Sequence, residues 1–205
     1  MKKIITVTMA CLIILSTFAL YTPHALGEKE NISATVDIAQ DCINLNTTGK
    51  WINAYIELPA EFNVNNIQVS TIMLNDTIPA ELQPTSIGDY DEDTIPDLMV
   101  TFNRTKIAEW LSSIITTYGN ATLNLTGQAK TAFFAGTDTI AISNLAGDVD
   151  CDGKVGLYDA TAMLVSYRSR EDEPKWNPNA DLAPPYGIIN IFDFVTFLSH
   201  YGEKY

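Results

Sequence analysis

The stretch Gly147-Asp148-Val149-Asp150-Cys151-Asp152-Gly153-Lys154-Val155-Gly156-Leu157-Tyr158-Asp159 decides the fold expected for the C-terminal part of this 205-residue chain. Counted from Asp148, aspartates fall at positions 1, 3, 5 and 12 of a loop, and a glycine falls at position 6. This is the spacing of an EF-hand calcium loop, with aspartate in place of the usual glutamate at position 12. Because four converging carboxylates repel one another, the pattern predicts a bound cation, Ca²⁺.

A second copy of this unit follows 34 residues later, where Val155–Asp159 aligns with Ile189–Asp193. The residues after each segment place apolar side chains at i, i+3, i+4 and i+7, which is one face of a helix. These faces are Ala160, Met163, Leu164 and Tyr167 in the first copy, and Phe194, Phe197, Leu198 and Tyr201 in the second. We therefore expect two loop–helix units whose helices pair through these faces.

This paired loop–helix pattern resembles a dockerin domain from Gly147 to about Gly202. The resemblance implies that each half binds calcium and that the domain docks onto a cohesin module, tethering a secreted protein to a scaffold. By position it assigns metal binding to the side chains of Asp148, Asp150, Asp152 and Asp159 and to the carbonyl of Lys154. It places Leu157, Tyr158, Ile191 and Phe192 at the cohesin contact. Their apolar character fits a small core equally well.

The second loop departs from this spacing because it is one residue longer and has no ligand at positions 3 and 5. Asp181, Asn190 and Asp193 remain, so a calcium site there needs backbone carbonyls or water as further ligands. The alternative is that Pro184-Pro185 braces the loop without a metal.

The N-terminus predicts export of the chain. Lys2-Lys3 followed by an apolar stretch is typical of a signal peptide over residues 1–27, cleaved before Glu28. An uncleaved membrane anchor is the alternative. After cleavage no membrane span is expected, and the location is secreted, extracellular or cell-surface. The formal net charge of −13 argues against nucleic acid and anionic membranes as partners.

Cysteines and sequons fit an exported chain. Cys42 and Cys151 remain after cleavage and are a disulfide candidate, with two separate thiols as the alternative. Asn-x-Ser/Thr sequons predict glycosylation, although Asn and Thr are also simply frequent in turns and strands. They begin at Asn31, Asn46, Asn75, Asn103, Asn120 and Asn124.

Residues 28–146 predict a β domain. Alternating apolar residues and turn-forming clusters indicate strands at 34–38, 51–58, 67–74, 97–103, 121–125, 130–134 and 137–143, with one helix at 104–115. The expected fold is therefore a mainly β, sandwich-like N-terminal domain followed by a small all-α, calcium-binding, dockerin-like domain at 147–205.

A third acidic loop lies inside the β domain. Asp89, Asp91, Asp93 and Asp97 are spaced like the short calcium loops of integrin-type propeller repeats, which they resemble. Thr94 stands where glycine is usual. We expect a structural calcium ion here, with an exposed acidic turn as the alternative.

No catalytic pattern emerges, so we do not expect an enzyme. The sequence favours a non-catalytic exported protein whose tail attaches to a cohesin-like protein or surface scaffold, with self-association as a variant. One alternative is a calcium-stabilised cell-surface or filament subunit. Another is a carbohydrate-binding module that uses Trp51 or Tyr55 as a stacking platform.

Overall fold

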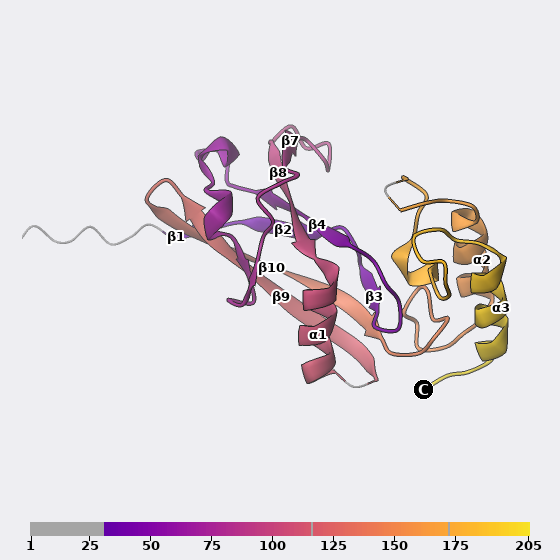
Figure 1. The fold of residues 1–205 in the computed structure, drawn as a ribbon. Helices are drawn as coiled ribbons and strands as arrows, with labels where there is room; N and C mark the ends of the chain where they lie inside the picture. The colour runs from indigo at the N-terminus through magenta and orange to yellow at the C-terminus, as the bar shows by residue number, and fades with distance from the viewer. Residues whose placement is uncertain (1–30, 116, 172) are drawn as a thin grey trace, which may run out of the picture.

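A computed structural model describes residues 31–205 except 116 and 172. The predicted signal peptide lies outside the described residues. Within them, two sheets and three α-helices are arranged as Figure 1 shows. No described helix has both the length and the apolar composition needed to cross a bilayer.

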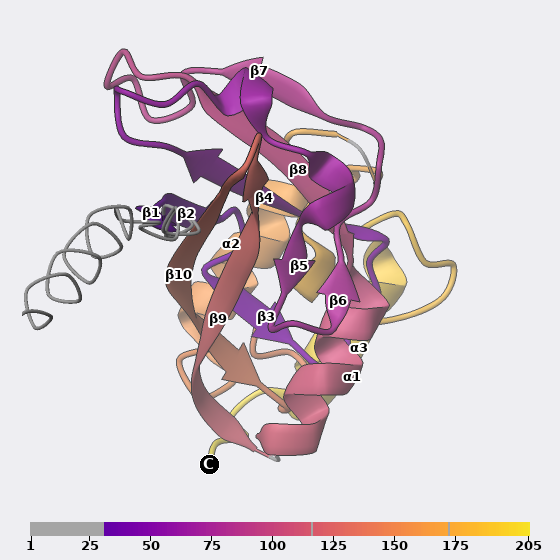
Figure 2. The ribbon, with the colours of Figure 1, turned by 90° about the vertical axis from the view of Figure 1, so that its left-hand side faces the viewer.

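The first sheet, sheet A, has six strands in the order β1-β10-β9-β5-β6, with β3 also paired to β10. Its strands are β1 (Asn31–Ser33), β3 (Cys42–Asn44), β5 (Met73–Leu74), β6 (Ile78–Pro79), β9 (Tyr118–Ala129) and β10 (Ala132–Ser143). The hairpin β9–β10 contains the two longest strands of this sheet, which lie side by side in Figure 2. Lys130, in the left-handed region at φ 54°, lies in the tight turn that joins them.

The second sheet, sheet B, has the order β2-β4-β8-β7 and is antiparallel throughout. Its strands are β2 (Thr35–Ile38), β4 (Trp51–Glu57), β7 (Ser86–Gly88) and β8 (Asp97–Asn103). Two 3₁₀ turns, η1 (Val64–Asn66) and η2 (Val69–Thr71), lie between β4 and β5. The predicted strand 67–74 is therefore wrong over most of its length, because η2 lies inside it and only β5, at its end, is a strand.

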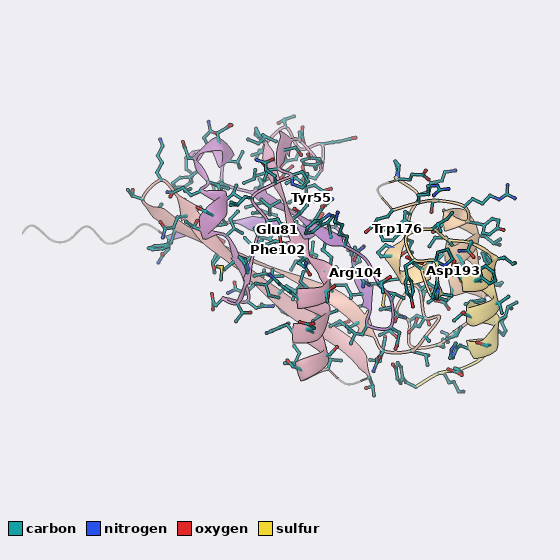
Figure 3. The ribbon with its side chains drawn as sticks, viewed as in Figure 1. Tyr55, Glu81, Phe102, Arg104, Trp176 and Asp193 are labelled. Atoms are coloured by element: carbon teal, nitrogen blue, oxygen red, sulfur yellow. A yellow bond between two sulfur atoms is a disulfide. The ribbon has the colours of Figure 1, made fainter. Side chains whose placement is uncertain are left out.

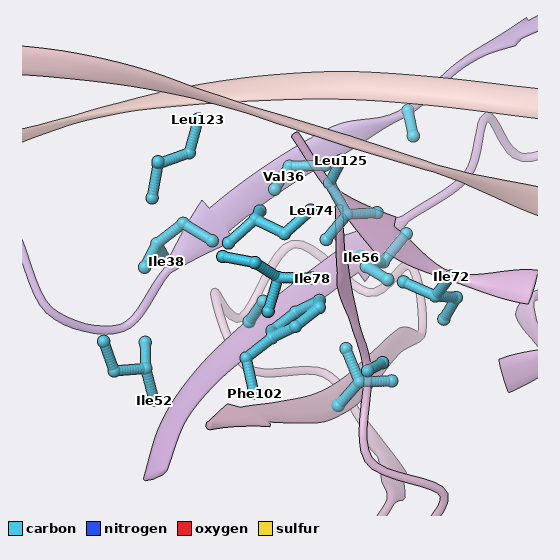
Figure 4. Packing of buried hydrophobic residues seen from close by; sticks show 14 of the residues in the cluster. Val36, Ile38, Ile52, Ile56, Ile72, Leu74, Ile78, Phe102, Leu123 and Leu125 are labelled. Carbon is cyan, nitrogen blue, oxygen red and sulfur yellow. The ribbon is translucent and has the colours of Figure 1, made fainter. Parts of the chain in front are cut away.

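One apolar core fills the space between the sheets. Alternate residues of β4 and β8, such as Ile52, Ile56 and Phe102, meet Leu123 and Leu125 of β9 (Figure 4). The helix α1 (Arg104–Ile114) begins at Asn103, whose side chain accepts from the Lys106 amide, and adds Ile107 and Leu111 to this core. The β-rich part of the prediction is therefore confirmed.

The predicted small all-α C-terminal domain is wrong. Within the described part of residues 147–205 there are two ten-residue helices, α2 (Leu157–Ser166) and α3 (Ile191–His200), and one 3₁₀ turn, η3 (Pro178–Ala180). The rest is turns, loops and isolated β-bridges. Most of the buried residues of the small core there lie outside the two α-helices, namely Val149, Val155 and Ile189 in loops and Ala180 in η3, alongside Met163 and Phe197.

The expected helix faces meet only in part. Met163 and Phe197 share one small core, and the Tyr167 and Phe194 rings lie 5.5 Å apart, centre to centre. Of the residues assigned to those faces only Met163 and Phe197 are buried, whereas Leu164 and Leu198 are 65% and 64% exposed. The physical reason is that loop residues cover Met163 and Phe197, which leaves the neighbouring positions on each helix facing solvent.

The C-terminal segment is joined to the β part by covalent and polar contacts. Cys42 of β3 and Cys151 form a disulfide across a separation of 109 residues. The backbone N–H of Asn44 donates to Asn179 Oδ1 at 3.0 Å, and the side-chain Nδ2 of Asn44 donates to the carbonyls of Leu145 and Asp148. The buried guanidinium of Arg104 also donates to Asn179 Oδ1, at 3.2 Å. These contacts hold the first acidic loop against the end of sheet A.

Candidate metal sites and the helix surface

The first acidic loop gathers four carboxylates. One oxygen each from Asp148, Asp150, Asp152 and Asp159 can be chosen so that all lie within 4.8 Å of one another. Two oxygens on opposite sides of an ion bound at 2.3–2.6 Å are at most about 5 Å apart. The cluster could therefore hold a metal ion, and this geometry does not select calcium over other cations.

Local structure fixes the two buried carboxylates of this cluster. Asp159 lies in the first turn of α2, where its Oδ2 accepts from the Gly156 amide at 2.7 Å, as in a capping box. Its Oδ1 accepts from the amides of Val149 and Asp150. Asp148 accepts from the Ser143 hydroxyl and from the amide of Gly153, which has φ +85°. These donors offset part of the repulsion between the carboxylates.

Burial shifts the titration of the cluster. Desolvation, followed by the charge of Asp159, raises the pKa of Asp150 to about 6. Desolvation also raises the pKa of Asp148, against the lowering effect of its hydrogen bonds from Ser143 and Gly153. Lys154, assigned as a carbonyl ligand, places its Nζ 2.9 Å from Asp152 on the exposed rim. This lysine is the cation nearest to the loop among the ion pairs of the described residues.

The second loop repeats the hydrogen-bond framework of the first with fewer carboxylates. Asp193 Oδ1 accepts from the amides of Leu182 and Ala183, and its Oδ2 accepts from Asn190. Asp181 Oδ2 accepts from Gly187, the counterpart of the bond from Gly153 to Asp148. Asn190 Oδ1 accepts from Phe192 and so caps α3.

Among the ligand candidates of this loop, Asp181 has a carboxylate oxygen that accepts no hydrogen bond. Its Oδ1 is buried and has no hydrogen-bond partner. Burial is the largest of the effects that raise its pKa to about 6. Among the described residues, no group of three acids, histidines or cysteines forms around this loop.

The third loop divides its acids between two overlapping groups. Asp89, Asp91 and Asp97 bring oxygens within 4.8 Å of one another, and so do Glu57, Asp91 and Asp93. Glu92 and Thr94 have φ of 64° and 79°, in the left-handed region where glycine is favoured. Each group could hold a metal ion, without specificity for calcium.

Glu57 is a ligand candidate that sequence reasoning missed. It ends β4 and lies directly opposite Asp97 in the antiparallel register of β4 and β8. The pairing of these two strands would have pointed to it, because residues paired across antiparallel strands share a face of the sheet.

The four apolar positions assigned to partner binding are exposed. Leu157 and Tyr158 begin α2 and are 72% and 73% exposed, and Ile191 and Phe192 begin α3 and are both 58% exposed. Further exposed apolar side chains follow on the same helices. We define the helix surface as these four residues together with Leu164, Val165, Val195, Leu198 and Tyr201.

The sequons lie in different surroundings. Asn31, Asn46 and Asn120 are exposed, and Asn103 and Asn124 are half-buried. Asn75 Nδ2, the atom that a glycan would join, is buried, and its Oδ1 accepts from the Asn124 amide. Glycosylation at Asn75 would require this turn to open.

Comparison with known proteins adds no family to this description. No protein-family model matches the chain, and no curated protein sequence matches it.

Proposed function

We propose that this protein is a non-catalytic, exported attachment protein that uses its helix surface to bind a protein partner while calcium holds the loops that begin the two helices. The proposal keeps the cohesin-like module or surface scaffold as the partner class. It does not require the C-terminal segment to fold alone.

The acidic cluster before α2 supports the calcium part of the proposal. Asp159 belongs both to the cluster and to the first turn of α2, so an ion bound there would fix the start of the helix. Oxygen-only donors at this spacing are those that calcium prefers, and extracellular sites operate at millimolar calcium. The cluster of Asp89, Asp91, Asp93 and Asp97 is proposed as a second, structural calcium site.

Exposure of the helix surface is the observation that carries the attachment part. All nine of its apolar side chains are at least half exposed. Large exposed apolar patches on soluble proteins mark interaction sites, and two neighbouring short helices that each expose several large apolar side chains are a candidate for one. Because residues of α2 and α3 both contribute, displacement of either helix would divide the surface.

The test uses the mature chain, residues 28–205, with a panel of immobilised cohesin modules in millimolar calcium and in chelator. Calorimetry first measures calcium binding by the wild type, Asp150→Asn and the control Asp76→Asn, which removes an exposed acid from a turn outside every cluster. Asp150→Asn should weaken binding at the first loop and Asp76→Asn should not.

Partner binding should then depend on calcium and on the helix surface. Replacing a central interface residue typically costs about 2 kcal/mol or more, so Phe192→Asp should weaken capture at least about 30-fold. Capture that persists in chelator, or that is unchanged in Phe192→Asp, would refute the proposal.

A second candidate is a calcium-stabilised subunit of a cell-surface layer or filament. The disulfide and the Asn44–Asn179 contacts favour it, because they bind the C-terminal segment to its own β part. In that case the helix surface meets another copy of the chain. Sedimentation that shows calcium-dependent oligomers abolished by Phe192→Asp, with no capture by any cohesin module, would select this candidate.

A further inference from the structure

A cleft separates the outer face of sheet B from the C-terminal segment. Its volume is about 590 Å³, and its walls include Trp51, Tyr55 and Thr101 on one side and Glu173 and Trp176 on the other. Figure 3 shows Tyr55 and Trp176 on the two facing parts of the molecule. A neighbouring cavity of about 730 Å³ shares lining residues with the cleft, among them Gln40 and Trp176, so the two cavities are adjacent.

Three buried polar atoms at this cleft have no hydrogen-bond partner. They are Gln40 Oε1, Thr101 Oγ1 and Trp176 Nε1, which are half of the six such side-chain atoms among the described residues. A buried polar group left unpaired costs about 1–3 kcal/mol. Such groups gathered at one cavity are explained if a ligand pairs with them.

Two of the three aromatic rings of the cleft contact a neighbouring side chain. Lys50 Nζ lies 5.2 Å from the centre of the Trp51 ring. The Tyr90 ring lies 4.4 Å from the Tyr55 ring, centre to centre. A ring fixed in this way loses little entropy when a ligand stacks on it.

The chemistry of the lining points to a neutral, hydroxyl-rich ligand. Thr101 can donate and accept, Trp176 Nε1 only donates, and Gln40 Oε1 only accepts, so a ligand must offer both roles, as sugar hydroxyls do. Glu171 and Glu173 line the cleft, and no described residue of its lining is Lys, Arg or His, which disfavours anions in the cleft. Lys175 lines only the adjacent cavity. Sugar rings also have apolar faces that stack on Trp and Tyr.

We infer that this cleft binds a neutral oligosaccharide, with Trp51, Tyr55 and Trp176 as stacking residues and Gln40, Thr101 and Trp176 as hydrogen-bond partners. The inference does not depend on calcium or on a partner at the helix surface. The volumes of the cleft and of the adjacent cavity leave room for more than one sugar unit.

The test titrates the mature, disulfide-bonded chain with hexamers of β-1,4-glucose, β-1,3-glucose, α-1,4-glucose and β-1,4-N-acetylglucosamine, and with a proline decamer. Calorimetry and tryptophan fluorescence report binding, in calcium and in chelator. The variants are Thr101→Val and Trp176→Phe, which each remove one polar group at nearly constant shape. Trp110→Phe is the matched control, because Trp110 is half-buried on α1 and does not line either cavity.

We expect at least one oligosaccharide to bind, with Thr101→Val and Trp176→Phe each weakening it about 5–10-fold and Trp110→Phe leaving it unchanged. Thr101→Val should also raise Tm, because it removes an unpaired hydroxyl from the free protein. No binding of any hexamer at millimolar concentration, or equal affinity in all variants, overturns the inference. Binding of the proline decamer alone would make the cleft a peptide groove and reject it.

Discussion

Removal of the disulfide should destabilise the whole protein, because its two cysteines connect the β part to the first acidic loop. Cys42 and Cys151 are 109 residues apart, and closing a loop of about 100 residues restricts the unfolded chain by about 4.7 kcal/mol. Cys151 also has φ +55°, a left-handed conformation that costs a non-glycine residue about 1–2 kcal/mol and that the bridge helps to hold.

This loss of stability corresponds to a large decrease in melting temperature. A protein of this size shifts its Tm by about 2–4 °C per kcal/mol, so Cys42→Ser/Cys151→Ser should melt about 10–20 °C lower than the wild type. Calcium affinity should fall as well, because Cys151 lies between the ligand candidates Asp150 and Asp152.

Scanning calorimetry of the mature chain, oxidised and reduced, tests this reasoning. The double variant is the control, because a reductant should lower the Tm of the wild type and leave that of the variant unchanged. Equal melting temperatures for oxidised and reduced wild type would show that the bridge does not restrain the unfolded chain, and the argument would fail.

Three further outcomes are expected. Burial raises the pKa of Asp150 and of Asp181 to about 6, so the folded state holds these protons more tightly than the unfolded state between about pH 4 and 6. In urea unfolding of the metal-free protein, the free energy of unfolding should therefore rise as pH falls from 7 to 4. Calorimetry should show calcium affinity falling over the same range. A free energy of unfolding of the metal-free protein that drops in this range would contradict the raised pKa of these two carboxyls. Arg104→Met should lower the free energy of unfolding in urea by about 3 kcal/mol, because it removes the guanidinium donor from the Thr47 carbonyl and one of the donors to the Asn44 carbonyl. A cost below about 1 kcal/mol would mean that the network is dispensable. Phe197→Ala should lower the free energy of unfolding by about 3–5 kcal/mol. Leu198→Ala, on the exposed side of the same helix, should change it by no more than about 0.5 kcal/mol. Equal changes would contradict the observed burial.

Much of the β part was predictable because its signals are local. Alternation over 51–58 corresponds to β4, and the stretch at 97–103 coincides with β8. The first acidic loop was equally readable, since a fixed spacing within twelve residues determines which side chains converge. Figure 1 shows the two sheets at one end of the described part of the chain and the helices α2 and α3 at the other.

Features that depend on distant partners could not be read from the sequence. The predicted strands 121–125, 130–134 and 137–143 became one hairpin, because twelve register pairs between β9 and β10 outweigh the local breaks at Gly127 and Gly136. The helix faces were misjudged for a related reason. Periodicity shows that a face is apolar but not what covers it.

The two loops of the repeat differ in the number of carboxylates that surround their first aspartate. Asp148 and Asp181 are both buried and both accept from a glycine amide five or six residues ahead. Three further carboxylates gather around Asp148, whereas no group of three acids, histidines or cysteines of the described residues forms around Asp181. Burial raises the pKa of Asp181 to about 6, and the charge of the buried Arg104 is the weakest of the effects that act on it. A calcium ion at the second loop would therefore need backbone carbonyls or water for most of its ligands. Calcium should fill the first loop at lower concentration than the second, because only the first loop offers several carboxylates at one point.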